Sequence, residues 1–416
     1  MIRMLHAGDL HLDSPFTSLK YFPENLWTQV YESTFDSFHQ IVQLAITQQV
    51  DVVILTGDIY DGADRSVKAQ ARLIRELEQL GNAQIPVVMI HGNHDHLAGE
   101  WLNLPFPENV YLLGPEVETI QLSFENGETA CFTGFSYAQR AVHERMITQY
   151  PVKNAQVDYQ IGLLHGNLEG SQSGHSPYAP FTIAELLEKK YDYWALGHIH
   201  QRKVLHELPA IVYSGNIQGR NKKEVGEKGC YLVELSPHDC RLVFHPTAPI
   251  IWQELSIDCA EISGIKGIYL MLSEALEKLE QEGKNKLLKV ILKHVELSDP
   301  QELKALKNGE LLAAFQDGQQ LKQPFIWMYQ LEIEEQEALS EFGTAYYQVE
   351  WEKMLKELTT EATFEQLAAP LFDHPNHLPF LEALSIEEKN EVIAHSKQLI
   401  LQQLSKKKRG DLREDL

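Results

Sequence analysis

The sequence is poor in cysteine, in long apolar runs and in positive charge. It has four cysteines in 416 residues, and no two of them form a C-x-x-C pair. The cysteines therefore predict neither a disulfide framework nor a zinc finger, and they suit reduced thiols in the cytoplasm. No stretch approaches the roughly 18 consecutive apolar residues of a membrane-spanning helix, so we expect no membrane association.

Basic residues are too few for a protein that holds nucleic acid by bulk electrostatics. The chain has 36 lysine and arginine residues against 59 aspartate and glutamate residues, and its net charge is −23. Binding of that kind needs basic side chains that displace counterions from phosphates, so the charge argues against it.

The rest of the composition is typical of a globular enzyme. Hydrophobic residues make up 44% of the chain and charged residues 23%, which leaves apolar material for a sizeable core. A single core stops growing at roughly 250 to 300 residues, so we expect two or three structural units. The N-terminal apolar stretch is interrupted by His6 and Asp9, which predicts a first strand rather than a signal peptide.

The first 200 residues alternate short apolar runs with amphipathic stretches. The runs are too short and too continuously apolar for amphipathic helices and predict strands buried on both faces. These runs are Ile2–Ala7, Val52–Thr56, Val87–Ile90, Ile161–Leu164 and Tyr193–Leu196. Helical spacing of apolar residues predicts helices over Leu26–Gln48 and Val67–Leu80. The order predicts a layered α/β core, with functional groups on loops at the carboxyl ends of the strands.

The pattern then changes twice. The next strand candidates, expected to complete a second sheet, are Ala210–Ser214, Cys230–Leu235, Arg241–His245 and Ile250–Ile257. A small α+β domain is predicted from the alternating segments Ile265–Gln281, Leu287–Val295, Pro300–Phe315 and Phe325–Ile333. From about residue 345 we expect helices and a frayed, lysine-rich tail. The expected domains are therefore residues 1–255, 256–340 and 341–416.

Five polar clusters each follow an apolar run. They are Asp9-Leu10-His11, Gly57-Asp58-Ile59-Tyr60-Asp61, Gly92-Asn93-His94-Asp95, His165-Gly166-Asn167 and Gly197-His198-Ile199-His200. Each cluster alone is a weak signal, because a single histidine after a strand is more often structural than a ligand. On one edge of a parallel sheet, however, they together offer carboxylate, imidazole and amide groups, which suit manganese, iron or zinc.

This series resembles the calcineurin-like metallophosphoesterases. That family has the motifs D-x-H, G-D-x-x-D, G-N-H-D/E, a histidine and G-H-x-H, and all five stand in this order between residues 9 and 200. The resemblance implies a four-layer α-β-β-α sandwich with an appended small α+β capping domain and C-terminal helices. It also implies two divalent metal ions, with Mn²⁺ expected and Fe²⁺ or Zn²⁺ as alternatives.

By position, the resemblance assigns ligands to both ions. The set for one ion is Asp9, His11, Asp58 and His200. The set for the other ion is Asn93, His165, His198 and the shared Asp58. A carboxylate is the natural bridge, since its two oxygens can each bind one of two cations about 3.5 to 4 Å apart. The pair of cations would activate a water molecule and stabilise the charge that grows on the phosphate during in-line attack.

His94 is the motif histidine that the resemblance leaves without a metal. It would stand over the phosphate and stabilise the transition state or protonate the leaving oxygen. Asp95 either orients His94, as acids often do for imidazoles, or is a turn residue. Asp61 is expected to support its loop rather than to bind metal. Histidines outside the motifs, among them His6 and His91, are expected to be structural or at the surface.

Two further segments, residues 11–15 and Tyr213–Arg220, resemble the bacterial DNA repair exonuclease branch of this family, the SbcD/YhaO-like proteins. The likeness implies hydrolysis of phosphodiester bonds in DNA. It also implies C-terminal helices that dock a coiled-coil ATPase of the SMC type, and a homodimer formed through helices in the Leu26–Gln48 region. The alternative is a phosphatase or phosphodiesterase that acts on small nucleotides or phosphoproteins. A scaffold without activity is disfavoured, because every ligand position is filled.

Arg65, Arg220 and Lys222 are the candidate contacts to substrate phosphate. Basic side chains near the metals could line a groove for a nucleic-acid backbone, although a surface cation is more often simply solvated. The chain lacks the histidine that archaeal and eukaryotic relatives carry at the position of Asp61. Their preference for one kind of DNA strand is therefore not transferred to this chain.

Overall fold

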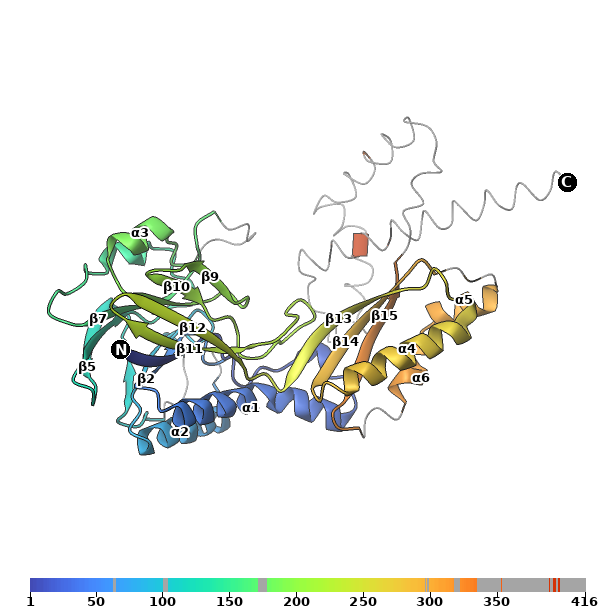
Figure 1. Cartoon of the computed structure of the whole chain (residues 1–416), viewed down its shortest axis with the longest axis horizontal. Helices are drawn as coiled ribbons and strands as arrows, with labels where there is room; N and C mark the ends of the chain where they lie inside the picture. The colour runs from blue at the N-terminus through green and yellow to red at the C-terminus, as the bar shows by residue number, and fades with distance from the viewer. Residues whose placement is uncertain are drawn as a thin grey trace, which may run out of the picture. The chain divides into compact units, whose positions relative to one another are not determined.

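Two six-stranded sheets stack face to face between Ile2 and Pro246 in the computed structural model (Figure 1). The structure describes residues 1–62, 65–99, 104–170, 178–295, 297, 299–317 and 322–334, with isolated positions at 353, 389, 392, 393 and 396. The chain divides into the units Met1–Ile333 and Glu334–Leu416. The predicted C-terminal helices and tail, residues 341–416, lie almost wholly outside the described residues, so the fold presented below is that of the first unit.

The first sheet has the strand order β12-β11-β1-β2-β3-β4. Its strands are β1 (Ile2–Ala7), β2 (Val52–Thr56), β3 (Val87–Ile90), β4 (Val110–Leu112), β11 (Gly229–Ser236) and β12 (Asp239–Pro246). Strands β1 to β4 run parallel, and β11 pairs with β1 in the antiparallel sense. The three strands predicted from residues 2 to 90 are confirmed at the same bounds. Cys230–Leu235 and Arg241–His245, which were expected in the second sheet, extend this first sheet instead.

Helices α1 (Glu24–Gln48) and α2 (Val67–Asn82) cover the outer face of the first sheet. Each connects two neighbouring parallel strands, as crossover helices do. Their buried stripes, such as Ile41 on α1 and Leu73 and Leu77 on α2, pack against side chains from alternate positions of β1, β2 and β3. Both helices were predicted from their apolar spacing, and both are confirmed. A short 3₁₀ turn, Thr17–Leu19, precedes α1.

The second sheet has the order β5-β6-β7-β8-β10-β9. Its strands are β5 (Glu118–Ser123), β6 (Thr129–Gly134), β7 (Tyr159–His165), β8 (Tyr193–Gly197), β9 (Lys203–His206) and β10 (Ala210–Tyr213). Its inner face meets the first sheet in a shared apolar core. Its outer face packs against α3 (Ile183–Glu188) and the 3₁₀ turn Met146–Gln149, around the fully buried Trp194. The expected α-β-β-α layering is therefore present.

The third sheet is small and wholly parallel, with the order β13-β14-β15. Its elements are β13 (Ile250–Asp258), α4 (Gly264–Glu280), β14 (Asn285–Lys293), α5 (Pro300–Lys307), α6 (Glu310–Gln316) and β15 (Ile326–Ile333). Because a helical crossover follows each of the first two strands, this is a parallel α/β unit rather than the α+β domain expected. Ile250–Ile257 correspondingly belongs to this sheet and not to the second one.

One predicted helix is divided in two. Residues 300–315 were expected as a single helix, but α5 ends before Asn308 and α6 begins after Gly309, whose φ is 80°. Glycine adopts this left-handed conformation without strain, and the conformation ends a helix. Both short helices still bury leucine and phenylalanine side chains against β14 and β15.

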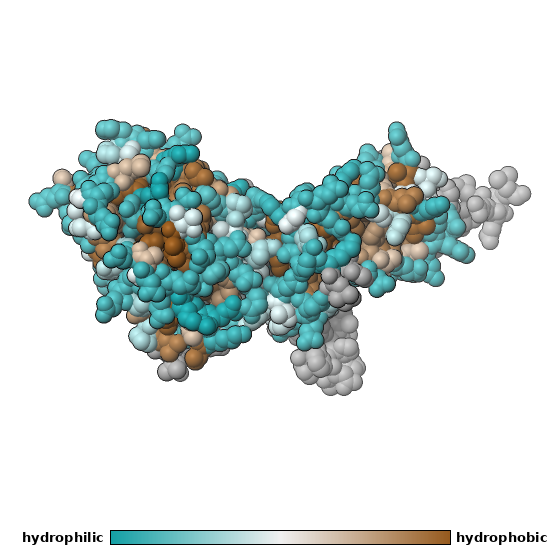
Figure 2. Space-filling model, turned by 60° about the horizontal axis from the view of Figure 1, so that its bottom comes forward, coloured by the Kyte–Doolittle hydropathy of each residue, from teal (hydrophilic) through white to brown (hydrophobic). Residues whose placement is uncertain are grey.

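The third sheet contacts the helical layer through the beginning of α1. Trp252, Leu287 and Trp327 from its three strands form an apolar cluster with Phe22 and Leu26. Polar residues predominate on the face of the molecule shown in Figure 2, and apolar groups emerge between them. Among the described residues no helix combines the length and the apolar character that crossing a membrane requires. All four cysteines are free thiols, as their spacing predicted.

Candidate metal centre

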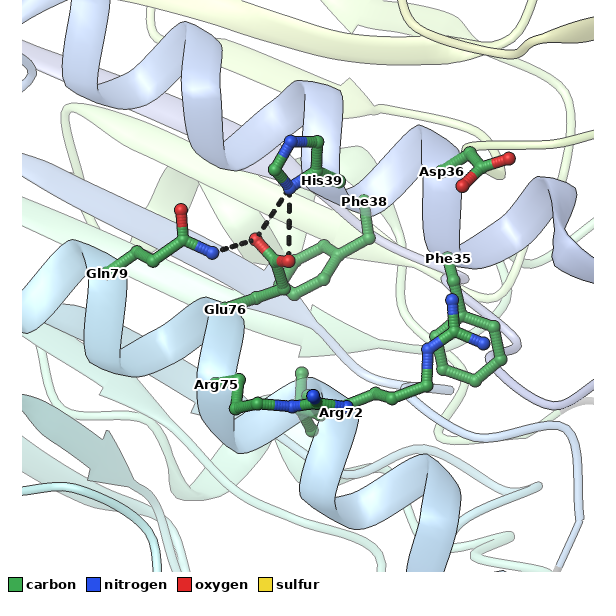
Figure 3. A pocket seen from close by; sticks show the side chains of 9 residues that line it. Phe35, Asp36, Phe38, His39, Arg72, Arg75, Glu76 and Gln79 are labelled. Carbon is green, nitrogen blue, oxygen red and sulfur yellow. Dashed lines mark hydrogen bonds and ion pairs between the residues drawn. The ribbon is translucent and has the colours of Figure 1, made fainter.

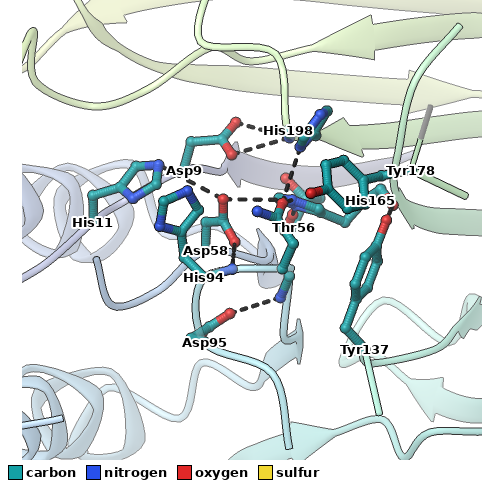
Figure 4. A network of polar contacts seen from close by, with 12 residues as sticks. Asp9, His11, Thr56, Asp58, His94, Asp95, Tyr137, His165, Tyr178 and His198 are labelled. Atoms are coloured by element: carbon teal, nitrogen blue, oxygen red, sulfur yellow. Dashed lines mark hydrogen bonds and ion pairs between the residues drawn. The ribbon is translucent and has the colours of Figure 1, made fainter. Parts of the chain in front are cut away.

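The five polar clusters come together where the parallel strands of both sheets end (Figure 4). Asp9 and His11 follow β1, Asp58 follows β2, and Asn93 follows β3. From the second sheet, His165 ends β7, while His198 and His200 follow β8. Carboxyl ends of parallel strands share one edge of a sheet, and the stacked sheets here bring their two edges to one place.

The backbone is strained at this place. Asp9, His11, Asp58 and His198 have positive φ angles of 49°, 44°, 48° and 96°. A side chain other than glycine enters this region rarely, at a cost on the order of 1 to 3 kcal/mol per residue, and the surrounding packing must hold it there. Four strained residues in one cluster are typical of a functional site.

The first ligand cluster consists of Asp9, His11, Asp58 and His200. Each offers one atom, and these atoms all lie within 4.8 Å of one another. The Nε2 atoms of His11 and His200 are 3.1 Å apart, and His11 Nε2 is 3.7 Å from Asp58 Oδ2. Two imidazole nitrogens and two carboxylates that converge in this way form a donor set for a divalent cation.

The second ligand cluster shares Asp58 with the first and adds His165 and His198. Asn93 Oδ1 lies 3.0 Å from His165 Nε2 and 3.0 Å from His198 Nδ1, so its amide oxygen faces the same point. Asp58 Oδ2 is 3.5 Å from His165 Nε2. The ring of Tyr178, which the motifs did not indicate, borders this cluster 5.4 Å from the ring of His198.

Burial explains why these groups suit a cation. Asp9 and Asp58 are each 1% exposed, and His11 and His165 are fully buried. Burial raises the pKa of Asp9, and burial together with the nearby Arg220 guanidinium holds the pKa of His11 well below its ordinary value. A neutral imidazole offers a lone pair to a metal, and a bound cation compensates buried carboxylates.

Close approach explains the glycine of the third motif. A Cβ atom on Gly92 would lie 2.3 Å from Asp58 Oδ1 and 2.6 Å from His165 Cε1. Both atoms belong to ligand side chains, so any larger residue would displace part of the cluster. The motif therefore requires glycine for space.

His94 lies beside the ligands without joining either four-residue set. Its main-chain N–H donates to Asp58 Oδ1 at 2.9 Å, and its ring lies 4.9 Å from the ring of His11. Its side chain is 36% exposed, which fits a group that meets substrate. Nδ1 is 3.0 Å from the carbonyl oxygen of Asp61. Because a carbonyl only accepts, Nδ1 carries the proton and Nε2 is the ring atom that can face a phosphate.

Asp95 acts on the loop rather than on His94. Its buried carboxylate accepts hydrogen bonds from His91 Nδ1 at 2.7 Å, Gly92 N at 2.7 Å and Ile59 N at 2.9 Å. Burial alone would raise the pKa of Asp95, but the charge and hydrogen bond of His91 outweigh it and lower that pKa. Of the two alternatives for Asp95, the one in which it orients the His94 imidazole is corrected: its carboxylate ties the loop after β3 to the loop after β2. His91 is structural, as expected.

Arg65 also has a structural place. Its side chain is 8% exposed, lies over the ring of Tyr60, and donates from Nη2 to the carbonyl oxygens of Asp95 and His96. A guanidinium so enclosed is not placed to receive a phosphate, which corrects the prediction for Arg65. Lys222 is exposed, whereas Arg220 is 15% exposed and lies in the metal centre.

Glu224 is the residue that the motifs missed. Its carboxylate accepts hydrogen bonds from His200 Nδ1, Asn216 Nδ2 and the main-chain N–H of Arg220, each at 2.7 Å. Burial alone would raise the pKa of Glu224, but the hydrogen bond from His200 and its charge outweigh burial and lower that pKa to about 2. The available sequence signal was an acid close to Arg220, a predicted phosphate contact.

A cavity of about 360 Å³ lies elsewhere, between α1 and α2, and none of the metal ligands line it (Figure 3). Its polar lining is already paired. His39 Nδ1 is 3.0 Å from Glu76 Oε1, and the Arg72 guanidinium lies 3.7 Å from the ring centre of Phe35 while pairing with Glu32 at 2.5 Å. We assign no chemistry to this cavity.

The donor sets fit two divalent ions. The first cluster would hold one and the second the other, with Asp58 common to both. Ions bound there would supply Lewis-acid polarisation of a phosphate and a water of lowered pKa. The chain itself positions the ligands, lowers the pKa of His11 by burial, and presents His94 and Arg220 beside them.

The chain is similar in sequence to a known family and to several known proteins. The family described as calcineurin-like phosphoesterase matches residues 2–202. The chain is 37% identical over 338 residues to the protein named uncharacterized metallophosphoesterase YhaO of Bacillus subtilis strain 168, covering 80% of this chain and 82% of that protein.

More distant relatives are nucleases or repair proteins by name. The DNA double-strand break repair protein Mre11 of Sulfurisphaera tokodaii is 27% identical over 56% of this chain and 60% of its own length. The SbcD component of the nuclease SbcCD of Staphylococcus epidermidis is 26% identical over 56% of this chain and 65% of its own length. With the extended match to YhaO and the two ligand clusters, the chain belongs to the calcineurin-like metallophosphoesterase family.

Proposed function

We propose that this protein hydrolyses phosphodiester bonds in DNA, as an exonuclease or endonuclease that uses two divalent ions, Mn²⁺ in the first place. The carrying observation is the pair of ligand clusters that share Asp58, with His94 partly exposed beside them. Ions held by the two clusters would supply an activated water as the nucleophile, and His94 would stabilise the transition state or protonate the leaving oxygen.

One observation favours DNA over a small substrate. The Mre11 and SbcD relatives match more than half of this chain and are named for DNA repair and nuclease activity. Arg220 adds a guanidinium beside His11 and His200, where it can contact a phosphate of the backbone. Such a contact suits any phosphodiester, so Arg220 supports the proposal without selecting DNA by itself.

The second candidate is a phosphatase or phosphodiesterase that acts on small nucleotides or phosphoproteins. The net charge of −23 favours it, because a DNA-binding surface needs more basic side chains than this chain has. The two candidates share the metal centre and differ in what lies around it.

The deciding experiment compares substrates on the purified chain with Mn²⁺. Labelled linear DNA, single-stranded and duplex, is tested beside an aryl phosphodiester and an aryl phosphomonoester. Cleavage of DNA that is abolished by a chelator supports the proposal. Turnover of the aryl esters without DNA cleavage, also in the presence of an ATPase partner, selects the second candidate.

The proposal extends to partners. Residues 341–416 would dock an SMC-like coiled-coil ATPase, and α1 would contribute to a homodimer. Phe35 and Phe38, two aromatic residues of α1, are 7% and 1% exposed and belong to the core, so a dimer would use the outer surface of the helix. Light scattering on the purified chain tests whether it is a dimer. A monomeric mass would contradict the homodimer.

A further inference from the structure

Carboxylates stand behind both imidazoles of the first ligand cluster. His11 Nδ1 lies 2.9 Å from Asp61 Oδ1, and His200 Nδ1 lies 2.7 Å from Glu224 Oε1. The opposite nitrogens of the same rings, the two Nε2 atoms, are 3.1 Å apart. The His200 ring is thus held by a hydrogen bond, between Glu224 and the ligand position, whereas the His11 ring lies beside Asp61 without a hydrogen bond to it.

The His165 imidazole of the second cluster has weaker support than the His200 imidazole of the first. His165 Nδ1 lies 2.9 Å from the main-chain carbonyl oxygen of Thr56, a neutral acceptor. Asn93 supplies an amide oxygen where the first cluster has the carboxylate of Asp9. A carboxylate behind an imidazole fixes its tautomer and raises its basicity as a ligand more than a neutral acceptor does. The two clusters therefore differ in both charge and support.

Arg220 connects the two supporting carboxylates. Its main-chain N–H donates to Glu224 Oε2 at 2.7 Å, and its guanidinium pairs with Asp61. Asn216 Nδ2 holds the same Glu224 oxygen at 2.7 Å. The side chains of Asp61 and Glu224 are only 14% and 11% exposed, so salt screens these contacts less than surface pairs.

We propose that Asp61 and Glu224 are positioning residues that make the first cluster the tighter of the two metal sites. The ions then bind in order: the site of Asp9, His11, Asp58 and His200 fills at lower free metal, and the site of Asn93, His165 and His198 fills second and exchanges more readily. Arg220 makes retention of the first ion depend on the segment from Asn216 to Glu224. The inference rests on the dimetal part of the proposed function and not on its substrate.

The test is a titration of the metal-free chain, residues 1–416, with Mn²⁺. Binding is measured by calorimetry and by the electron paramagnetic resonance signal of free Mn²⁺. Wild-type protein is expected to bind two ions in two distinguishable steps. Glu224→Gln should weaken the tighter step by about 10- to 100-fold, the usual effect of losing such a support, and should leave the weaker step nearly unchanged.

The matched control is Glu227→Gln. It removes the same charge three positions further along the chain, from a side chain that is 40% exposed and pairs with Lys284 rather than with a ligand. This variant should show both wild-type steps. A parallel loss in Glu227→Gln would show that net charge, and not position, sets the affinity.

Three results would overturn the inference: two equal steps in the wild type, two wild-type steps in Glu224→Gln, or selective weakening of the second step. If circular dichroism shows that Glu224→Gln is unfolded, Asp61→Asn tests the same claim at His11 with the same expected loss. The titration contains no DNA. Failure of the chain to cleave DNA would therefore leave the metal-binding result intact.

Discussion

The sharpest functional prediction concerns His94→Ala. In the structure the main chain of His94, not its imidazole, donates to Asp58, and the ring belongs to neither four-residue ligand set. Truncation should leave two ions bound. The lost bond from Nδ1 to the Asp61 carbonyl is worth about 1 kcal/mol, so the protein should remain folded with a small fall in melting temperature.

The rate should respond far more strongly than the stability. A positioned proton donor contributes about 10²- to 10⁴-fold, which corresponds to about 3 to 5 kcal/mol of activation free energy. Because the donor serves the leaving oxygen, the loss should be greatest for DNA, whose leaving alkoxide is basic. It should be smaller for a nitrophenyl ester, whose leaving group needs little protonation. His94→Gln, which keeps a polar side chain of similar reach, should behave in the same way.

The assay combines kcat on both substrates with metal analysis of the same preparation. Equal losses on both esters with two ions retained would assign His94 to transition-state binding and reject proton donation. A loss of activity that merely followed loss of metal would refute the reasoning, since the imidazole belongs to neither of the two ligand sets that share Asp58.

Three further predictions follow from burial and close contact. Asp58→Ala removes the shared ligand, so elemental analysis should find fewer than two ions per chain; two retained ions would contradict the shared role. Gly92→Ala places a methyl group 2.3 Å from Asp58 Oδ1. It should lower metal content and activity at least about 10-fold. Wild-type values would show that the loop can move to make room for the methyl group. Burial lowers the pKa of His6 to about 3, so the unfolded chain alone takes up this proton as pH falls from 6.5 toward 3. Stability to urea should fall by up to about 1.4 kcal/mol per pH unit in that window, and less steeply in His6→Gln; identical slopes would exclude His6 as the cause.

The strands and the metal ligands were predictable for the same reason. Strands buried on both faces require continuous apolar runs, as in Val52–Thr56, and the polar residue that follows such a run is conspicuous. Asp9, Asp58 and His165 could therefore be placed at strand ends, where the fold brings them together. The assignment of each ligand to one ion came from the resemblance of the five motifs to a known family.

Sheet membership was not predictable in the same way. Strands β11 and β12 have alternating patterns that suit either sheet, and only the antiparallel pairing of β11 with β1 decides between them. The parallel order of β13, β14 and β15 likewise depends on long-range pairing, which local periodicity does not encode.

The contacts around the ligands were the hardest part of the site to predict from the sequence. Asp95 and Arg65 stand in or near a motif, yet each has a main-chain partner in a neighbouring loop, Ile59 N–H for Asp95 and the Asp95 carbonyl for Arg65. Glu224 supports His200 from 24 positions away in the chain. The sequence shows which residues are charged, but it does not show which groups they contact, because tertiary packing decides the contacts.

The backbone is left-handed at Asp9, His11, Asp58 and His198. Replacing these ligands by glycine would therefore relieve torsional strain in the folded chain but would remove the groups that hold the metal. Glycine at any of these positions would relieve on the order of 1 kcal/mol of torsional strain while deleting a ligand. If a library of variants is selected for thermal stability alone, with no screen for activity, substitutions at these four positions should be enriched. The selected variants should be more stable and inactive.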